Sequence, residues 1–109
     1  MRVAEILALA GHRVEFLPES IHKTPDIRLD GIEFEIKSPI TNKTEKIERN
    51  IKRALKQSDN IIIDSSRIRN YQEQRMLGYL TQKARTQKQI HRLIFITKNG
   101  QIIDIKMPN

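Results

Sequence analysis

Asp26, Glu35 and Lys37 are the residues of this sequence whose types and spacing could do chemistry together. They belong to a segment, residues 27–37 with Asp26 just before it, in which apolar and polar residues alternate strictly around a central Asp-Gly pair. Such a pair between two alternating runs predicts a two-residue hairpin turn. Asp26 then falls directly opposite Glu35, and opposed residues have Cβ atoms roughly 4.5–5.5 Å apart. Two carboxylates at that separation could bind one cation, with Lys37 on the same face.

The hairpin is expected to have one buried apolar face and one polar face. The apolar face carries Ile27, Leu29, Ile32, Phe34 and Ile36, and the polar face carries Asp26, Arg28, Glu33, Glu35 and Lys37. Opposed like charges destabilise a hairpin unless a positive charge lies between them, and carboxylate oxygens suit hard divalent cations. We therefore expect a divalent metal ion, Mg²⁺ first, with Mn²⁺ or Zn²⁺ as alternatives. A polar hairpin face that is simply solvated and binds no metal alternates in the same way. Arg28 opposite Glu33 fits such simple cross-strand pairing, so a solvated face without a metal ion stays open as an alternative.

The distribution of charge favours a polyanionic partner. The net charge is +7 over 109 residues. Residues 1–40 hold five Lys/Arg against seven Asp/Glu, whereas residues 41–109 hold fifteen against six. A basic body around a small acidic centre suits a nucleic acid whose phosphate meets a metal ion. The sequence has no cysteine, which excludes disulfides and thiolate metal sites, and no apolar run approaches the roughly 20 residues that span a bilayer.

The pattern along the chain predicts one domain over residues 1–109, with an α/β fold in which helices flank a mixed central sheet. The expected elements are a helix over 3–11, a strand over 12–17, the hairpin over 27–37, a helix from the capping residues 41–44 to about 58, a strand over 60–64, a helix over 71–87 and a second hairpin over 92–106. The strand over 60–64 is a continuous apolar run, as expected when both faces are buried. His22 is expected at the surface of a loop.

Basic residues on the helix before residue 58 form a candidate nucleic-acid contact. They are Arg49, Lys52, Arg53 and Lys56, on the side opposite the apolar stripe of that helix, and Arg67 follows in a later loop. Because they come soon after Lys37 in the chain, they could follow the phosphates of a bound strand. A simple solvated helix face is the alternative explanation.

The order of these motifs resembles a known nuclease motif. Pro-Asp, a hairpin and then Glu-x-Lys is similar to the PD-(D/E)XK motif of the restriction-endonuclease-like superfamily, whose core order is αβββαβ. A closer resemblance covers almost the whole chain, through the blocks GHRVEFLPE, TPDIRLDGIEFEIKSP, RNIKRALKQSDNIIID and RLIFITKNGQIIDIK. These blocks resemble the C-terminal nuclease domains of contact-dependent growth inhibition (CDI) toxins, particularly the tRNA-cleaving ones, and small relatives carried by mobile elements.

The resemblance implies roles for individual residues. The metal-binding carboxylates would be Asp26 and Glu35, the catalytic lysine would be Lys37, and the helical glutamate that often joins such a site would be Glu5. Glu33 adds a carboxylate to the same face, so the third acidic role stays open between Glu5 and Glu33. The resemblance also implies a cognate immunity protein, expected to be acidic, and delivery into the bacterial cytoplasm as the C-terminal part of a larger secreted protein.

The sequence therefore predicts a metal-dependent endonuclease that hydrolyses phosphodiester bonds, with tRNA as the expected substrate. Two alternatives remain open at this stage. One is a metal-dependent DNase of the same fold. The other is a basic nucleic-acid-binding domain without catalysis, although the few aromatic residues offer little for stacking single-stranded bases.

Overall fold

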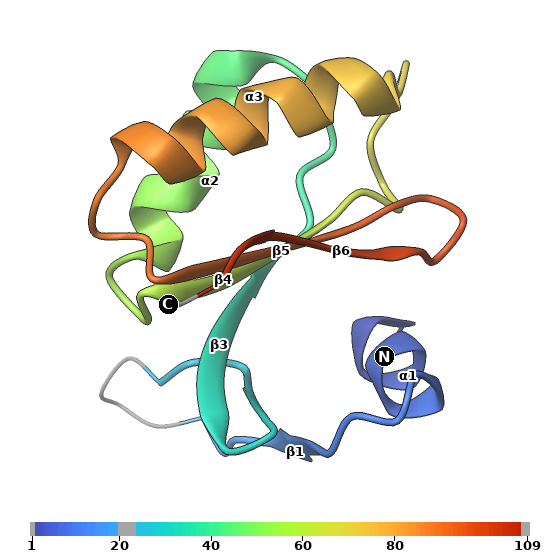
Figure 1. The fold of residues 1–109 in the computed structure, drawn as a ribbon, viewed down its shortest axis with the longest axis vertical. Helices are drawn as coiled ribbons and strands as arrows, with labels where there is room; N and C mark the ends of the chain where they lie inside the picture. The colour runs from blue at the N-terminus through green and yellow to red at the C-terminus, as the bar shows by residue number, and fades with distance from the viewer. Residues whose placement is uncertain (1, 20–23, 108–109) are drawn as a thin grey trace.

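A computed structural model describes residues 2–19 and 24–107, and in these ranges the chain forms three helices and a sheet of six strands (Figure 1). The elements are α1 (Arg2–Leu9), β1 (Val14–Phe16), β2 (Ile27–Leu29), β3 (Ile32–Lys37), α2 (Thr44–Ala54), β4 (Asn60–Asp64), α3 (Glu73–Thr86), β5 (Arg92–Ile96) and β6 (Ile102–Lys106). The first six follow the expected αβββαβ order, so the predicted fold class is confirmed. His22 lies outside the described residues.

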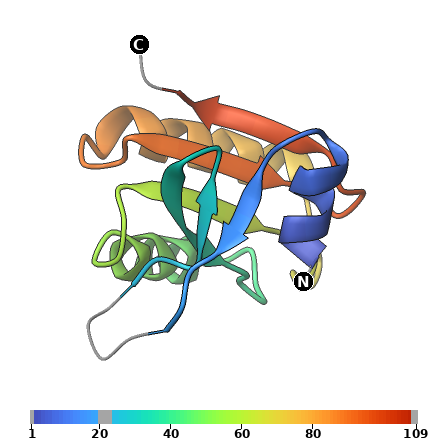
Figure 2. The ribbon, with the colours of Figure 1, turned by 90° about the horizontal axis from the view of Figure 1, so that it is seen from below.

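The strands lie side by side in sequence order, β1 to β6. The β3/β4 and β4/β5 pairs are parallel, and the other neighbouring pairs are antiparallel. β3 changes partner along its length: residues 32–34 pair with β2, and residues 35–37 pair with β4. The curved β3 thus joins the β1–β2 end of the sheet to its centre (Figures 1 and 2).

Helices cover both faces of the sheet. α2 and α3 lie on one face, and α1 lies on the other (Figure 1). The face under α2 and α3 buries Ile61, Ile63 and Phe95 among its core residues. The α1 face buries Phe34 and Ile62. Alternate residues of β4 therefore enter different cores, which explains its continuous apolar run.

The turn between β2 and β3 has the geometry that its sequence predicts. Asp30 and Gly31 have φ values of 50° and 85°, as a two-residue hairpin turn of type I′ requires. His12 Nδ1 lies 2.7 Å from Asp30 Oδ2, and the Arg13 N–H donates to Asp30 Oδ1 at 2.8 Å. The hydrogen bond with His12 is the main cause that holds the pKa of Asp30 below its usual range. The turn is thereby fixed to the segment that leads into β1.

One expectation about the hairpin faces is wrong, and one residue of the polar face is more buried than its pattern indicates. Ile32, expected in the core, is 37 % exposed because it directly follows the turn at the tip of the hairpin. Glu35, on the face expected to be polar, is only 7 % exposed because its part of β3 pairs with β4 under α2. The helix α2 also ends at Ala54, earlier than expected, and tight turns carry the chain on to Ser58.

The loop after β4 contains a core residue that the sequence pattern did not indicate. Ile68 is fully buried within an otherwise polar segment, and its N–H donates to the carbonyl of Ser65 at 3.0 Å. We expect Ile68→Ala to lower the free energy of unfolding by about 2–5 kcal/mol, because it leaves a cavity under α3. Urea denaturation measures this, with Leu9→Ala as the control at an 89 % exposed position. Equal, small losses in both variants would contradict the packing role of Ile68.

Candidate active site

Asp26 directly precedes the first residue of β2, opposite the point where β3 changes its pairing from β2 to β4. Its N–H donates to the carbonyl of Phe34 at 3.1 Å, and its own carbonyl accepts from the N–H of Leu17 at 3.2 Å. Its side chain turns back to β3, where Oδ2 accepts from the N–H of Ile36 at 2.8 Å. The Ile27↔Phe34 pairing, extended by one residue, puts Asp26 opposite Glu35. The predicted cross-strand register of the two carboxylates is therefore present.

Glu35 occupies an environment that opposes its negative charge. Its side chain is almost fully buried on the α2 face of the sheet, beside Ile61 of β4. Burial is the largest cause that raises the pKa of Glu35, to about 7. The Asp26 carboxylate raises it further through its charge and through a hydrogen bond between the two carboxyl groups. Among the described atoms, Glu35 Oε1 is buried without a hydrogen-bond partner, which is a costly state for a carboxylate.

Lys37 brings a positive charge to the same carboxylate. It follows Glu35 by two residues on β3, and its Nζ lies 3.4 Å from Glu35 Oε2. The side chain of Lys37 is 24 % exposed, so it is partly accessible from solvent while it contacts a buried partner. This contact lowers the pKa of Glu35 but does not outweigh burial and Asp26.

The arrangement of Asp26 and Glu35 fits a hard divalent cation. The Glu35 carboxylate, whose ionisation is opposed by burial and by the neighbouring Asp26 carboxylate and which has one unpartnered oxygen, gains from a positive charge placed beside it. Within residues 2–19 and 24–107, no group of three or more His, Cys, Asp or Glu side chains could hold a metal ion. Mg²⁺ needs no such cage, because it is commonly bound through one or two carboxylates, with waters and substrate phosphates completing its coordination.

Glu5 and Glu33, the two candidates for a third carboxylate, are both exposed, unlike Glu35. Glu5 is exposed on α1, where it lines a pocket with Val14 and Phe16 of β1. Glu33 is exposed on β3, and its Oε2 lies 3.3 Å from an Arg28 guanidinium that also reaches Glu15 at 3.5 Å. Arg28 thus pairs with carboxylates on both neighbouring strands, as the alternative of simple cross-strand pairing expects for this part of the hairpin.

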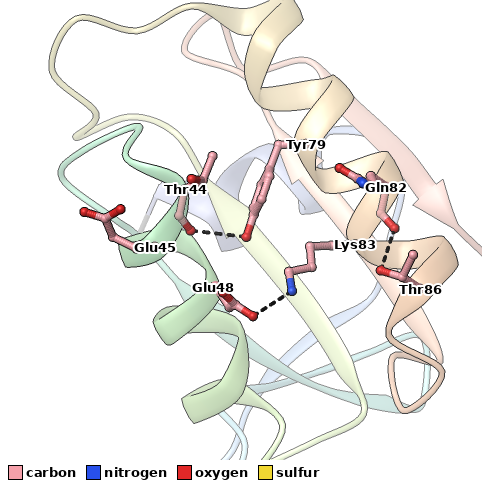
Figure 3. A pocket seen from close by; sticks show the side chains of 7 residues that line it. All are labelled: Thr44, Glu45, Glu48, Tyr79, Gln82, Lys83 and Thr86. Carbon is pink, nitrogen blue, oxygen red and sulfur yellow. Dashed lines mark hydrogen bonds and ion pairs between the residues drawn. The ribbon is translucent and has the colours of Figure 1, made fainter.

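The basic residues of α2 divide between different sides of the helix. The side toward α3 is marked by Glu48, whose Oε1 accepts from Lys83 Nζ at 2.8 Å (Figure 3). Lys52 belongs to this side, 3.8 Å from the same oxygen. Arg53 lies on the other side, roughly opposite Glu48, in a stripe with Lys46. Since α2 packs against β3 and α3 against β6, this second side lies nearer to the strand that carries the candidate site.

The comparison with known protein families identifies the chain. A family model described as the contact-dependent growth inhibition CdiA C-terminal domain matches residues 23–102 of the 109. The chain belongs to this family. The expected relation to CDI systems is thereby confirmed, and the matched region includes the residues Asp26, Glu35 and Lys37.

A solved structure agrees with this CdiA C-terminal assignment. It is a chain described as "CdiA-CT/CdiI toxin and immunity complex from Burkholderia pseudomallei", with a TM-score of 0.75 and 24 % sequence identity. The match covers 94 % of this chain and 78 % of that one, so the two share a fold. A comparison with curated proteins gave no match. No helix in the described part of the chain has the length and apolar character to cross a membrane.

A buried polar network in this CdiA C-terminal domain was not anticipated from the sequence. Asp64, at the end of β4, is 4 % exposed and accepts hydrogen bonds from the hydroxyl groups of Ser66 at 2.8 Å and Ser38 at 3.4 Å. Arg2 of α1 pairs with it at 3.4 Å. Because Ser38 directly follows Lys37, this network anchors the end of β3. Arg67, the basic candidate in the next loop, is exposed.

Proposed function

We propose that this CdiA C-terminal domain is a metal-dependent nuclease of the restriction-endonuclease-like superfamily, a toxin domain that cleaves tRNA. The observation that carries the proposal is the environment of Glu35. Its buried carboxylate has an unpartnered oxygen and lies against the Asp26 carboxylate and 3.4 Å from the Lys37 ammonium. Strongly shifted carboxylates beside a specific charge partner mark candidate functional sites. The αβββαβ order and the Pro-Asp, Glu-x-Lys spacing agree with this chemistry.

In the proposed mechanism, Asp26 and Glu35 would hold the divalent cation and Lys37 acts on the substrate. The cation, when bound, would supply Lewis-acid stabilisation of charge on a phosphoryl oxygen. Lys37 points its ammonium at the same region and stabilises the negative charge that develops on the scissile phosphate. The hydrogen bond from Ile36 N–H to Asp26 fixes one carboxylate, and burial beside Ile61 fixes the other, so the groups need little rearrangement. Pre-organised charges of this kind contribute strongly to catalysis.

A single experiment separates the proposed tRNA nuclease from its alternatives. Purified protein is incubated with total RNA and with plasmid DNA, in EDTA and then with Mg²⁺, Mn²⁺ or Zn²⁺. We expect tRNA to be cut only when a divalent ion is present, and Asp26→Asn protein to be inactive. Cleavage of plasmid DNA alone would replace the proposal with a DNase. Tight binding without any cleavage would leave a binding domain and overturn the nuclease assignment.

We further propose a cognate acidic immunity protein that covers the site, since the chain carries a net charge of +7. The structural neighbour was solved as a toxin and immunity complex, which supports a partner of this kind. The proposed site of action is the bacterial cytoplasm, after delivery as part of a larger secreted protein. Titrating the protein with its candidate partner should block tRNA cleavage at a one-to-one ratio. A partner that binds fully without reducing cleavage would contradict a covering role.

The proposed nucleic-acid contacts predict a difference between two basic residues of α2. Arg53 has no ion pair within the described residues, whereas Lys52 lies 3.8 Å from Glu48. We expect Arg53→Ala to reduce the slope of log affinity against log salt by about one unit, the loss expected for one phosphate contact. Lys52→Ala should change this slope less, because Glu48 already offsets part of the charge of Lys52 and because Lys52 faces α3. Equal slopes for Arg53→Ala and the parent protein would show that Arg53 contacts no phosphate and that this face of the helix is simply solvated.

A further inference from the structure

A cationic pocket lies next to the candidate active site and is not explained by it. Its volume is 440 Å³, within the roughly 300–1,000 Å³ range of small-molecule sites. The lining residues are Ile40, Thr41, Asn42, Lys43, Lys46, Arg69 and Asn70. They comprise three cations and no carboxylate, which favours an anionic ligand.

The position of the pocket follows from the topology of the sheet. Its walls are the loop after β3 with the first turn of α2, and the loop after β4. β3 and β4 are parallel neighbours, so both loops leave the sheet at its carboxyl edge. In α/β sheets, ligands commonly bind outside this edge. Ile40 comes three residues after Lys37, so the pocket adjoins the proposed catalytic lysine along the chain.

Hydrogen bonds between the two loops hold the pocket open in a defined shape. The Arg69 N–H donates to the carbonyl of Ile40 at 3.1 Å. The side-chain amide of Asn42 donates to the carbonyl of Asn70 at 3.0 Å. Nearer the sheet, the Ser38 hydroxyl donates to Asp64 at 3.4 Å. The cations therefore lie on or next to loops that are already hydrogen-bonded to each other, so less conformational entropy is lost when a ligand binds.

The cations of the pocket have no partner of opposite charge among residues 2–19 and 24–107. Lys43, Lys46 and Arg69 are exposed, and none forms an ion pair within the described residues. Like charges gathered in one pocket repel one another, and a phosphate group would relieve this repulsion. Ile40, 53 % exposed, adds an apolar wall that a free phosphate would not use. A ligand with a phosphate and an attached apolar ring system uses both features.

We propose that this pocket is a nucleotide subsite, in which Lys43, Lys46 and Arg69 bind a phosphate of the substrate strand and Ile40 contacts the attached nucleoside. The inference rests on the proposed nuclease function and deepens it. The bound nucleotide belongs to the strand whose scissile phosphate lies at Lys37, so the three cations are positioning residues. A pocket between two loops accepts an unpaired nucleotide more readily than one stacked in a duplex, which favours a loop or end of a structured RNA.

The test uses ¹⁵N-labelled Lys37→Ala protein, so that oligonucleotide probes are not cut. Adenosine 5′-monophosphate, inorganic phosphate, adenosine and a short single-stranded RNA are titrated while the amides of Asn42, Lys46 and Arg69 are followed by NMR. We expect the nucleotide and the RNA to shift these amides, and the nucleotide to bind more tightly than phosphate or adenosine. An RNA that competes with the nucleotide for the same amides identifies the substrate strand as the source. Phosphate binding as tightly as the nucleotide would overturn the role of Ile40, and unshifted amides would overturn the site.

A charge-matched pair of variants tests the cations. Introducing both Lys46→Ala and Arg69→Ala into the Lys37→Ala protein should weaken nucleotide binding by roughly tenfold or more, which is the scale of losing charged hydrogen bonds. Arg85→Ala with Lys88→Ala, exposed positions at and just after the C-terminal end of α3, should leave the nucleotide affinity within about twofold of the parent value. Equal losses in both pairs would overturn the subsite.

The same pairs are compared with Lys37 intact in single-turnover cleavage of tRNA. The variant with Lys46→Ala and Arg69→Ala should need a higher protein concentration to reach half of the maximal cleavage rate. Its cleavage rate at saturating protein should change little. If the parent protein cuts no nucleic acid, the proposed function fails, and the nucleotide titration still decides the subsite on its own.

Discussion

Replacing Lys37 by Ala is expected to lower the rate of tRNA cleavage by about two orders of magnitude or more, with little loss of substrate affinity. The reason is the position of its ammonium group, 3.4 Å from Glu35 and beside the proposed cation site. A charge held there acts mainly on negative charge that develops in the transition state, and removing one such donor commonly costs about 10²–10³ in rate. Single-turnover cleavage gives the rate, and binding with Ca²⁺ in place of Mg²⁺ gives the affinity.

Two further variants sharpen the Lys37 prediction. Lys37→Arg should restore little activity, because a planar guanidinium does not reproduce a compact ammonium in a partly buried space. Lys88→Ala removes an equal charge from an exposed position and should leave both rate and affinity unchanged. If Lys37→Ala cuts as fast as the parent, or if its affinity falls in step with its rate, Lys37 is only a phosphate contact. The nuclease assignment would then lose its central residue.

The register of the hairpin formed by β2 and β3 could be predicted because it is set locally. Asp30 and Gly31 have the positive φ values that their residue types favour, and the turn fixes which residues face each other. Asp26 opposite Glu35 follows from counting outward from that turn. The burial of Glu35 could not be predicted in this way. It depends on β3 leaving β2 and pairing with Ile61 of β4, a contact between distant parts of the chain.

The surroundings of the site show the same division between local and distant information. The apolar run of β4 predicts a strand buried on both faces, and the structure confirms it. Ile68 gave no signal, because a single apolar residue in a polar loop has no periodicity. The nucleotide pocket brings Ile40 next to Arg69 through a hydrogen bond between two loops. No spacing in the sequence encodes such a contact, so Lys46 and Arg69 were not among the predicted site residues.

The second large effect concerns the stability of the metal-free protein as a function of pH. The pKa of Glu35 is raised from 4.5 to about 7, first by burial and then by Asp26. Between these two values the native state keeps a proton that the unfolded state has lost. The contribution of Glu35 to the free energy of unfolding is therefore highest below pH 4.5. It falls as the pH rises toward 7 and then levels off. Between pH 4.5 and about pH 7, the free energy of unfolding should fall by an amount of the order of 3 kcal/mol.

Glu35→Gln should remove this pH dependence and abolish cleavage at the same time. A neutral amide of the same shape carries no charge to bury, so the variant should be more stable than the parent at pH 8 in EDTA. Asp26→Asn should reduce the pH dependence without removing it, because burial of Glu35 remains. Glu33→Gln serves as the control, since Glu33 is exposed and paired with Arg28. Urea denaturation at pH 5 and pH 8 in EDTA measures all four proteins.

The same cause predicts how metal ions act on stability. A divalent cation that binds Asp26 and Glu35 competes with the proton on Glu35, so its affinity should fall below about pH 7. Adding Mg²⁺ at pH 8 should therefore stabilise the parent protein, whereas Glu35→Gln should gain little. A parent protein equally stable at pH 5 and pH 8, together with a Glu35→Gln variant destabilised at both, would make Glu35 a structural partner of Lys37. The metal site proposed here would then have no basis.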